Sequence, residues 1–464
     1  MSNRCKRGGF MIMEGTFMAK RWLVYTMAAA LTAVLAACGS SQAGDKTNDS
    51  AKSGEAKSEA SAADAIAKAA KDPVELTVYF NDGSYTLERF METYGNAIRK
   101  KYPNFTFRVL VPGKGVTLKD LVAQGQTIDL MQTHRANIYE MLIDLNLQND
   151  VSDLVQKYNY NLGQIETVVL DEMRQLANGG IYGLPNGSSL VGLMYNKDLF
   201  DKFGVAYPKD GMSWDDAFEL SKKMSRAEGG VNYQGLIVIG RHYHLMNQLS
   251  QGYVDPATNK ATLNNDNWKK LFDNFSRAFN VDGNPYVPIA QANNVFWKEG
   301  RAAMLVSMFV SGAEYVRNTN IRWDMAPLPM LKERPGVGSG LLNYYFNVTS
   351  ISKHRDQAFL AATVLASEEY QKEQTLKGDG PALKGDKYRD SMGKGVRQFA
   401  DKNLKNLIPV QPAPSYKVNK YQSVVDKVLD TAFDEVAAGK KDANTALRDA
   451  EELANKKIAE LNGK

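Results

Sequence analysis

The sequence predicts an α/β fold in two lobes, because strand and helix patterns alternate and the chain is too long for one core. Three segments are rich in β-branched and aromatic residues or are short apolar runs, as is typical of strands: LTVYF (76–80), FTFRVLV (105–111) and IDLMQ (128–132). Strands separated by helices predict a parallel sheet with right-handed crossovers. About 390 residues follow Pro73, more than one hydrophobic core usually holds, so two lobes are expected.

Helical periodicity lies between these strands. One apolar stripe recurs at helical spacing, at Leu87, Phe90, Met91, Tyr94 and Ile98. Further helix candidates cover 118–124 and the stretch that carries Ile138, Met141, Leu142 and Leu145. The order is therefore strand, helix, strand, helix, strand, helix.

Polar residues follow the ends of the first and third strands. In open α/β sheets, ligands bind beyond the carboxyl ends of the strands. Asn81 and Asp82 follow the first strand, and Gln132, Thr133 and His134 end the third. We expect a ligand site at this edge.

The N-terminal segment predicts a secretion signal. Lys20 and Arg21 precede sixteen uncharged residues, 22–37, which is fewer than the roughly 20 that a permanent membrane helix needs. A basic start, a short apolar core and small residues before a cut describe a signal peptide. We predict that residues 1–37 are removed, and the layout favours Met18 as the translation start.

Cys38 ends this segment and is one of two cysteines, with Cys5, so a disulfide framework is excluded. The run Leu35-Ala36-Ala37-Cys38 resembles the lipobox of bacterial lipoproteins. That resemblance implies a diacylglycerol on the Cys38 sulfur and a further acyl group, such as palmitate, on its amino group. More than one chain gives stable anchoring at the extracytoplasmic face of the cell membrane. The alternative is a chance cysteine after a signal peptide.

The basic charge belongs mostly to the leader. Residues 1–37 carry five Lys/Arg and one acid, which is +4 of the formal +5, so the mature chain is near +1. Nucleic-acid binders show basic patches on a folded domain. The composition therefore gives no support for nucleic acid as a partner.

Residues 38–72 predict a lipidated cysteine followed by a flexible tether. The stretch 39–72 has no aromatic residue and one large aliphatic, Ile66, so it cannot bury enough surface to offset chain entropy. A frayed helix is the alternative for the Ala-rich end, 60–70.

The middle of the chain carries a family resemblance. Residues 180–224 read GIYGLPNGSSLVGLMYNKDLFDKFGVAYPKDGMSWDDAFELSKKM. Three elements stand out in this stretch: YGLP, YNKDLF and a helix start at Trp-Asp-Asp. They resemble the signature region of the family 1 bacterial extracellular solute-binding proteins, which are the carbohydrate-type receptors of ABC importers. Ser213 and Asp216 predict a capping box for that helix. Further similar segments are DPATNKATLNNDNW (255–268), FWKEGRAAMLV (296–306), APLP (326–329) and 346–371.

The resemblance implies a two-lobe fold of the periplasmic-binding-protein type (type II), with the ligand cleft between the lobes. Carried onto this chain, lobe one is 73–187 plus 305–352, and lobe two is 188–304 plus 353–464. It also implies a monomer without a cofactor that binds a sugar, with an oligosaccharide favoured, and delivers it to the permease subunits of an ABC importer.

Candidate ligand contacts combine aromatic faces with planar polar groups, which suit the apolar and hydroxyl surfaces of a sugar. The resemblance places an aromatic contact from lobe two at Tyr243 and one on the opposite wall near Phe309, where SMF stands in place of Gly-Pro-Trp. The loop re-entering lobe one adds Asn343, Tyr344 and Tyr345, and Tyr416 and Tyr421 are weaker candidates. Core packing is the alternative for each aromatic. The polar candidates are Asp82, Gln132, His134 and Arg241, with Asn81 and Asn186 beside them.

Other chemistries have less support. His242 and His244 form an H-x-H, but the chain has only four histidines and no cysteine in the mature body to complete a zinc set, so no metal site is predicted. No nucleophile elbow, zinc helix or Gly-rich cofactor loop is present. The alternatives are the same fold with a polyamine, metal or phosphoester ligand, and a surface enzyme that degrades polysaccharide.

Overall fold

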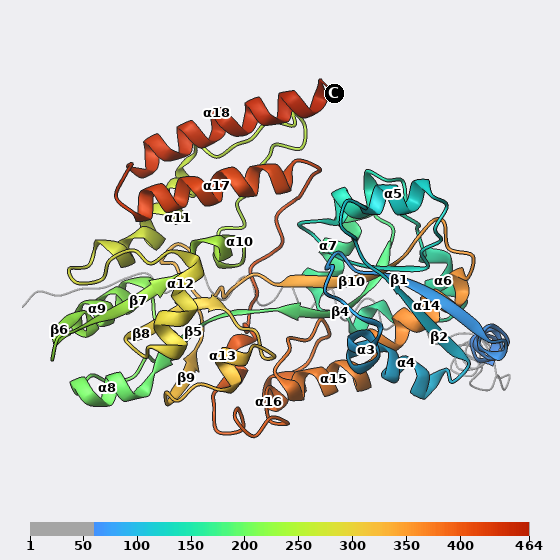
Figure 1. The fold of residues 1–464 in the computed structure, drawn as a ribbon, viewed down its shortest axis with the longest axis horizontal. Helices are drawn as coiled ribbons and strands as arrows, with labels where there is room; N and C mark the ends of the chain where they lie inside the picture. Colours follow the sequence, from blue (N-terminus) through green and yellow to red (C-terminus); the bar gives the residue numbers. More distant parts are fainter. Residues whose placement is uncertain (1–59, 464) are drawn as a thin grey trace, which may run out of the picture. The chain divides into compact units, whose positions relative to one another are not determined.

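The computed structural model describes residues 60–463 and contains two five-stranded sheets (Figure 1). The first has the order β2-β1-β3-β10-β4 and the second β6-β7-β8-β5-β9. We call the part built on the first sheet lobe one and the part built on the second lobe two. The first sheet consists of β1 (Val74–Tyr79), β2 (Phe105–Leu110), β3 (Leu130–His134), β4 (Gly183–Ser189) and β10 (Leu342–Val348).

The strands expected near residues 76, 105 and 128 form the parallel part of the first sheet. β1 pairs in parallel with both β2 and β3, while β10 runs antiparallel between β3 and β4. β1, β3 and β4 therefore end, and β10 begins, at one edge of the sheet. This edge is the one that the strand pattern predicts for a ligand.

The second sheet is mixed. β7 and β8 are parallel, and β5 is antiparallel to β8 and β9. Its buried strands are almost continuously apolar, as expected where helices cover a sheet. The strands are β5 (Val191–Asn196), β6 (Arg226–Glu228), β7 (Val231–Val238), β8 (Ala302–Met308) and β9 (Trp323–Ala326).

Helices surround each sheet (Figure 1). Lobe one carries α3 (Leu87–Phe90), η1 (Met91–Gly95), α4 (Asn96–Lys101), α5 (Leu118–Ala123), η2 (Tyr139–Ile143), α6 (Ser152–Lys157), η3 (Leu162–Gln164), α7 (Thr167–Leu176), α14 (Arg355–Leu365) and α15 (Glu368–Lys377). Lobe two carries α8 (Lys197–Phe203), α9 (Trp214–Met224), η4 (Gly240–His242), α10 (Tyr243–Met246), α11 (Asp266–Ser276), η5 (Arg277–Asn280), α12 (Ile289–Asn293), η6 (Asn294–Lys298), α13 (Glu314–Arg317), α17 (Gln422–Ala437) and α18 (Ala443–Asn462). Between them, α16 (Asp386–Ser391) packs on α15, and η7 (Leu404–Leu407) packs on β9.

Local sequence signals set individual helix starts. The Ser213 side chain accepts from the Asp216 amide, and the Asp216 carboxylate accepts in return from the Ser213 amide, so the expected capping box is confirmed. Trp214 and Phe218 of α9 are 2% exposed and lie in the core of lobe two. The cap therefore fixes where the buried face of this helix begins.

The lobes divide the chain differently from the partition expected from the resemblance. β8 and β9, within 305–352, belong to the second sheet, while α14 and α15, beyond 352, pack on lobe one. The chain crosses between β4 and β5, again between β9 and β10, and a third time after α15. No local pattern marks these crossings, because a strand looks alike in either sheet.

Part of the predicted tether is structured. Residues 60–71 form a helix, with Ala62 buried at 7% exposure and Ile66 packed against the core. The alternative prediction of a helix at the Ala-rich end is therefore confirmed. The prediction of a flexible tether is wrong for these residues, because their small side chains pack closely against the core. The leader, Cys38 and residues 39–59 lie outside the described residues.

Within residues 60–463 no helix has both the length and the apolar character needed to cross a bilayer.

Candidate functional site

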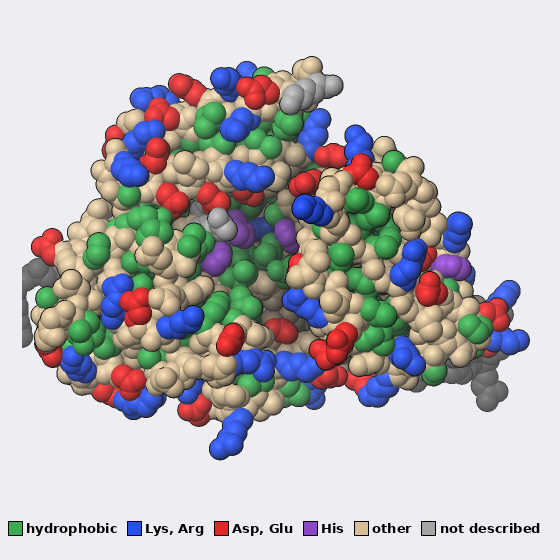
Figure 2. Space-filling model, viewed as in Figure 1, with side chains coloured by type: hydrophobic (Ala, Val, Ile, Leu, Met, Phe, Trp, Pro, Cys, Tyr) green, Lys and Arg blue, Asp and Glu red, His purple; other side chains and the backbone are tan. Residues whose placement is uncertain are grey.

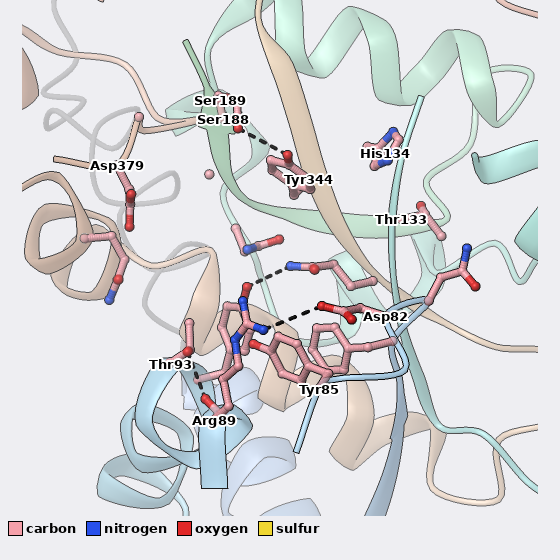
Figure 3. Close-up of a pocket in the computed structure, with 18 of the residues that line it drawn as sticks. Asp82, Tyr85, Arg89, Thr93, Thr133, His134, Ser188, Ser189, Tyr344 and Asp379 are labelled. Atoms are coloured by element: carbon pink, nitrogen blue, oxygen red, sulfur yellow. Dashed lines mark hydrogen bonds and ion pairs between the residues drawn. The ribbon is translucent and has the colours of Figure 1, made fainter. Parts of the chain in front are cut away.

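A cavity of about 510 Å³ opens at the edge where β1, β3 and β4 end and β10 begins. The face drawn in Figure 2 is hollowed between the two lobes, and histidine side chains gather there. Figure 3 shows the lining side chains converging on the cavity from lobe one. The residues that line the cavity are Phe80, Asn81, Asp82, Tyr85, Arg89, Thr93, Tyr94, Gln132, Thr133, His134, Asn137, Asn186, Gly187, Ser188, Ser189, Tyr344, Tyr370, Gln374, Asp379 and Gly380.

A stacked aromatic pair forms one wall. The Phe80 and Tyr85 rings lie 4.0 Å apart and almost parallel at 11°. The Arg89 guanidinium lies 4.5 Å from the Tyr85 ring centroid, and its Nη1 lies 3.5 Å from Asp82 Oδ2. Hydrogen bonds from the Ser84 hydroxyl and amide hold the pKa of the Asp82 carboxyl below its usual value. Phe80 and Arg89 therefore cover the Tyr85 ring, and this wall presents the Arg89 guanidinium beside an ionised carboxylate.

His134 supplies a neutral donor. The Ala136 amide donates to His134 Nδ1 at 3.2 Å, so the neutral ring carries its proton on Nε2. Burial, and then the charge of Arg135, lower the pKa of His134 from 6.5 to about 4. The ring stands edge-on to Tyr344, with centroids 5.7 Å apart. His134 is thus uncharged at neutral pH.

Asn186 has an unsatisfied acceptor. Its side chain is 9% exposed, and within residues 60–463 no group donates to Oδ1. A buried polar atom without a partner is costly. Asn186 lines the cavity, but Oδ1 itself is buried, so a ligand hydroxyl reaches it only if the side chain turns.

Two backbone segments cross closely at the base of the cavity. The Ser188 amide donates to the Gly380 carbonyl at 2.8 Å, and a Cβ at Gly380 would lie only 2.4 Å from the Ser188 carbonyl oxygen. Glycine is therefore required there. This crossing brings the loop after α15, including Asp379, to the cavity.

Other lining side chains are fixed by hydrogen bonds. Gln132 Nε2 donates to Tyr94 Oη at 2.9 Å, and Ser189 Oγ donates to Tyr344 Oη at 3.2 Å. Side chains that are already hydrogen-bonded within the protein lose less conformational freedom when a ligand binds. The cavity is therefore partly preorganised.

Six of the candidate contacts line this cavity. They are Asn81, Asp82, Gln132, His134, Asn186 and Tyr344, and Thr133 joins them.

Asn343 and Tyr345 face away from the cavity. Their exposures are 0% and 2%. Tyr345 Oη donates to Glu172 Oε1 at 2.6 Å and Asn343 Nδ2 donates to the same atom at 3.1 Å. Successive residues of a strand point to opposite faces, so only Tyr344 of this triplet reaches the cavity. For Asn343 and Tyr345 the structure favours packing over ligand contact.

These two residues belong to a buried ionic cluster, which we define as Arg135, Glu172, Asn343, Tyr345 and Ser415. Arg135 Nη1 lies 3.5 Å from Glu172 Oε2, and both side chains are 3% exposed. Arg135 also donates to the His244 carbonyl of lobe two at 3.4 Å, and Ser415 Oγ donates to Glu172 Oε2 at 2.7 Å. The cluster therefore links lobe one with lobe two and with the segment that enters α17.

The remaining candidates lie elsewhere. Phe309 is 7% exposed and packs near Trp323 and Phe399, so it belongs to a core. Tyr416 is 7% exposed beneath the Arg135 guanidinium, and Tyr421 is 3% exposed and donates to Asn462. The side chains of Arg241 and Tyr243 lie outside the described residues, so their contacts stay predictions.

Several lining residues were missed by sequence reasoning. Tyr94 belongs to the apolar stripe read as a core face, although it lies at the cavity. Tyr85 and Arg89 follow the first strand closely, and an aromatic just after Asn81-Asp82 could have suggested them. Asp379 and Gly380 had no such signal, because only the crossing with Ser188 brings them near.

The arrangement suits binding rather than metal chemistry. Within residues 60–463 no group of three His, Cys, Asp or Glu side chains is placed to hold a metal ion. The cavity presents aromatic faces, one ion pair, a neutral imidazole and amide groups, a set that matches a hydroxyl-rich solute.

The fold and this cavity define a two-lobed solute receptor. A family model described as bacterial extracellular solute-binding protein matches residues 51–372. This is more than half of the chain, so the chain belongs to that family. Its members are binding proteins that serve transport, and the chain is accordingly not an enzyme.

Individual relatives are distant in sequence. A galactooligosaccharide-binding protein of Bacillus subtilis (strain 168) is 24% identical, over 95% of this chain and 98% of the relative. A sugar transporter protein from Rhizobium etli, in an open conformation, is 20% identical with a TM-score of 0.65, covering 82% of this chain and 99% of that one. An ABC substrate-binding protein of Listeria monocytogenes in complex with cycloalternan is 18% identical with a TM-score of 0.63, covering 84% and 100%. The structural likenesses show the fold, which is the two-lobe α/β fold expected from the sequence.

Proposed function

We propose that this protein is a lipid-anchored receptor that binds a sugar, with an oligosaccharide favoured, in the cavity at the end of β1, β3 and β4 and delivers it to an ABC importer. The observation that carries the proposal is the lining itself. The half-buried Tyr344 ring can pack against the apolar face of a sugar ring, while the Asp82 carboxylate and the amides of Asn81 and Gln132 pair with its hydroxyls.

Each proposed contact has a role that follows from its chemistry. The Asp82 carboxylate accepts charge-assisted hydrogen bonds from hydroxyls. The neutral His134 ring donates through Nε2, and Tyr344 packs beside it. Asn81, Gln132 and Asn186 complete the polar set. Arg241 and Tyr243 remain proposed contacts from lobe two.

The non-sugar alternatives fit this lining less well. A phosphoester calls for several cationic donors, and Arg89, the one Lys or Arg among the described lining residues, already pairs with Asp82. The relatives add support for sugar: one is named for galactooligosaccharides and another holds cycloalternan.

A thermal-shift screen tests the ligand class. Galactotriose, maltotriose, spermidine, glycerol phosphate and divalent metal ions are each added to the purified protein. A ligand at a hundred times its Kd adds about 2.7 kcal/mol to the free energy of unfolding. We expect a saturable rise with a neutral sugar. A rise with spermidine, glycerol phosphate or a metal ion alone would contradict the sugar assignment.

Membrane anchoring through Cys38 is tested separately. Replacing Cys38→Ala removes the acylated sulfur, so the protein should leave the membrane fraction or accumulate as an uncleaved precursor. The measurement is fractionation combined with labelling by a palmitate analogue. Cys5→Ala is the matched control and should leave both labelling and location unchanged.

A further inference from the structure

Asp379 is a second carboxylate at the cavity, and it lies across the cavity from Asp82 and His134 (Figure 3). It sits in the loop after α15, beside the glycine that crosses Ser188, and its side chain is accessible to solvent. It is far in sequence from the other lining residues of β1 and β3.

A lobe two residue positions this carboxylate. Ser311 Oγ donates to Asp379 Oδ1 at 2.6 Å, and Ser311 is 6% exposed in the loop after β8. The Arg317 side chain in turn donates to the Ser311 carbonyl at 2.9 Å. Among the side chains that the structure describes, which exclude those of Arg241 and Tyr243, no second donor reaches the Asp379 carboxylate, so Oδ2 remains for a ligand. Asp379 thus joins the cavity wall to lobe two.

The charge of the described lining is negative. Asp82 and Asp379 are acids, His134 is neutral, and Arg89 is the one basic side chain and is paired with Asp82. Lys377 pairs with Glu373, at 2.8 Å, and neither lines the cavity. Desolvation by the surrounding protein raises the pKa of Asp379, while the Ser311 hydrogen bond and the charges of Lys377 and Arg317 oppose that shift.

We propose that Asp379 determines specificity in this site by accepting hydroxyl hydrogen bonds from a neutral sugar and repelling acidic sugars such as uronates. The inference rests on the proposed function. Ser311 occupies Oδ1, so a ligand hydroxyl can donate to Oδ2, and the resulting bond is charge-assisted. A ligand carboxylate would instead place two anions together in a site that offers no free described cation, which is strongly unfavourable.

The test is isothermal titration of the purified protein with matched trisaccharides. Galactotriose is compared with trigalacturonate, and maltotriose with a glucuronic acid trisaccharide. In whichever of these two sugar pairs binds, we expect the neutral trisaccharide to bind at least about tenfold more tightly than the acidic one. Asp379→Asn keeps the acceptor for Ser311 but removes the charge, so the neutral-to-acidic ratio should fall by about tenfold. Glu373→Gln removes a charge from α15 outside the cavity and should leave the ratio unchanged.

The outcomes separate the two proposals. Binding of neither neutral sugar would overturn the proposed function and this inference with it. Neutral binding with equal acidic affinity, or an unchanged ratio in Asp379→Asn, would overturn the role of Asp379 alone. Tight uronate binding that Arg241→Ala abolishes would assign the charge preference to Arg241 instead. Ser311→Ala should weaken binding of the neutral sugar while keeping the ratio, because it loosens Asp379 without neutralising it.

Discussion

The cavity and the buried ionic cluster are built on opposite faces of the same strands. On β10, Tyr344 points to the cavity, while Asn343 and Tyr345 bind Glu172 behind the sheet. His134 and Arg135 divide in the same way at the end of β3. Because successive side chains of a strand point to opposite faces of the sheet, neighbouring residues serve either the cavity or the cluster. The cavity keeps polar atoms unsatisfied for a ligand, whereas the cluster satisfies its own and joins the lobes.

The two regions also influence each other electrically. The buried charge of Arg135 helps to lower the pKa of His134, after burial itself. Glu172 compensates Arg135 on the far side of the sheet. The neutral state of His134 therefore follows mainly from burial and in smaller part from the Arg135 charge behind the sheet.

The largest expected effect is at the cluster. Glu172→Gln leaves the buried Arg135 charge uncompensated, and breaking a buried pair costs about 3–5 kcal/mol of unfolding free energy. Chemical denaturation measures the loss. Glu369→Gln, in the exposed pair with Lys100, is the control and should leave stability unchanged. Equal stability of the Glu172→Gln variant and the wild type would contradict a stabilising role for the Arg135–Glu172 pair.

His134 gives the next largest effect, as a pH dependence of stability. Its pKa is about 4 in the folded protein and 6.5 without perturbation, so the unfolded chain binds the proton first as the pH falls. Stability should therefore decline between pH 6.5 and pH 4, by up to about 3 kcal/mol, and be unaffected above that window. Denaturation across this range should show a smaller decline for His134→Gln. Parallel curves would indicate that His134 titrates normally.

Tyr344 tests the cavity face. Tyr344→Ala should weaken affinity for the neutral trisaccharide by roughly tenfold or more, because it removes an aromatic wall. Titration calorimetry measures the change. Since Tyr344 is only half-buried, the unfolding free energy should fall less than for a core aromatic. An unchanged affinity would show that Tyr344 does not contact the ligand.

Tyr345 is next in sequence, and its substitution should lower stability without changing affinity. This is the smallest effect that we expect. Burial and the nearby Glu172 charge hold the pKa of Tyr345 above its usual value, so the phenol stays protonated and donates to Glu172. Tyr345→Phe removes that bond and should cost about 1–2 kcal/mol of stability. Affinity should be unchanged. A loss of affinity without a loss of stability would reverse the assignment of the two faces.

Local patterns predicted the site only in part. The strand ends identified Asn81, Asp82, Gln132 and His134, since ligands gather at the carboxyl ends of such strands. Of the triplet 343–345 only Tyr344 lines the cavity. Which of the three faces it depends on the pairing of β10 with β3 and β4, which the sequence does not show. Phe309 follows a buried strand as a ligand contact would, yet its neighbours Trp323 and Phe399 come from distant segments and make it part of a core.

The sequence by itself determined the α/β class, the parallel start of the first sheet, the α9 cap and the family, because these depend on periodicity and short motifs. Only the tertiary structure decided which strands share a sheet, where α14 and α15 pack, and that Asp379 meets Ser311 and the cavity. Those outcomes depend on contacts between segments hundreds of residues apart. Such contacts are selected by packing and pairing of whole elements and leave no signature in any one stretch of chain.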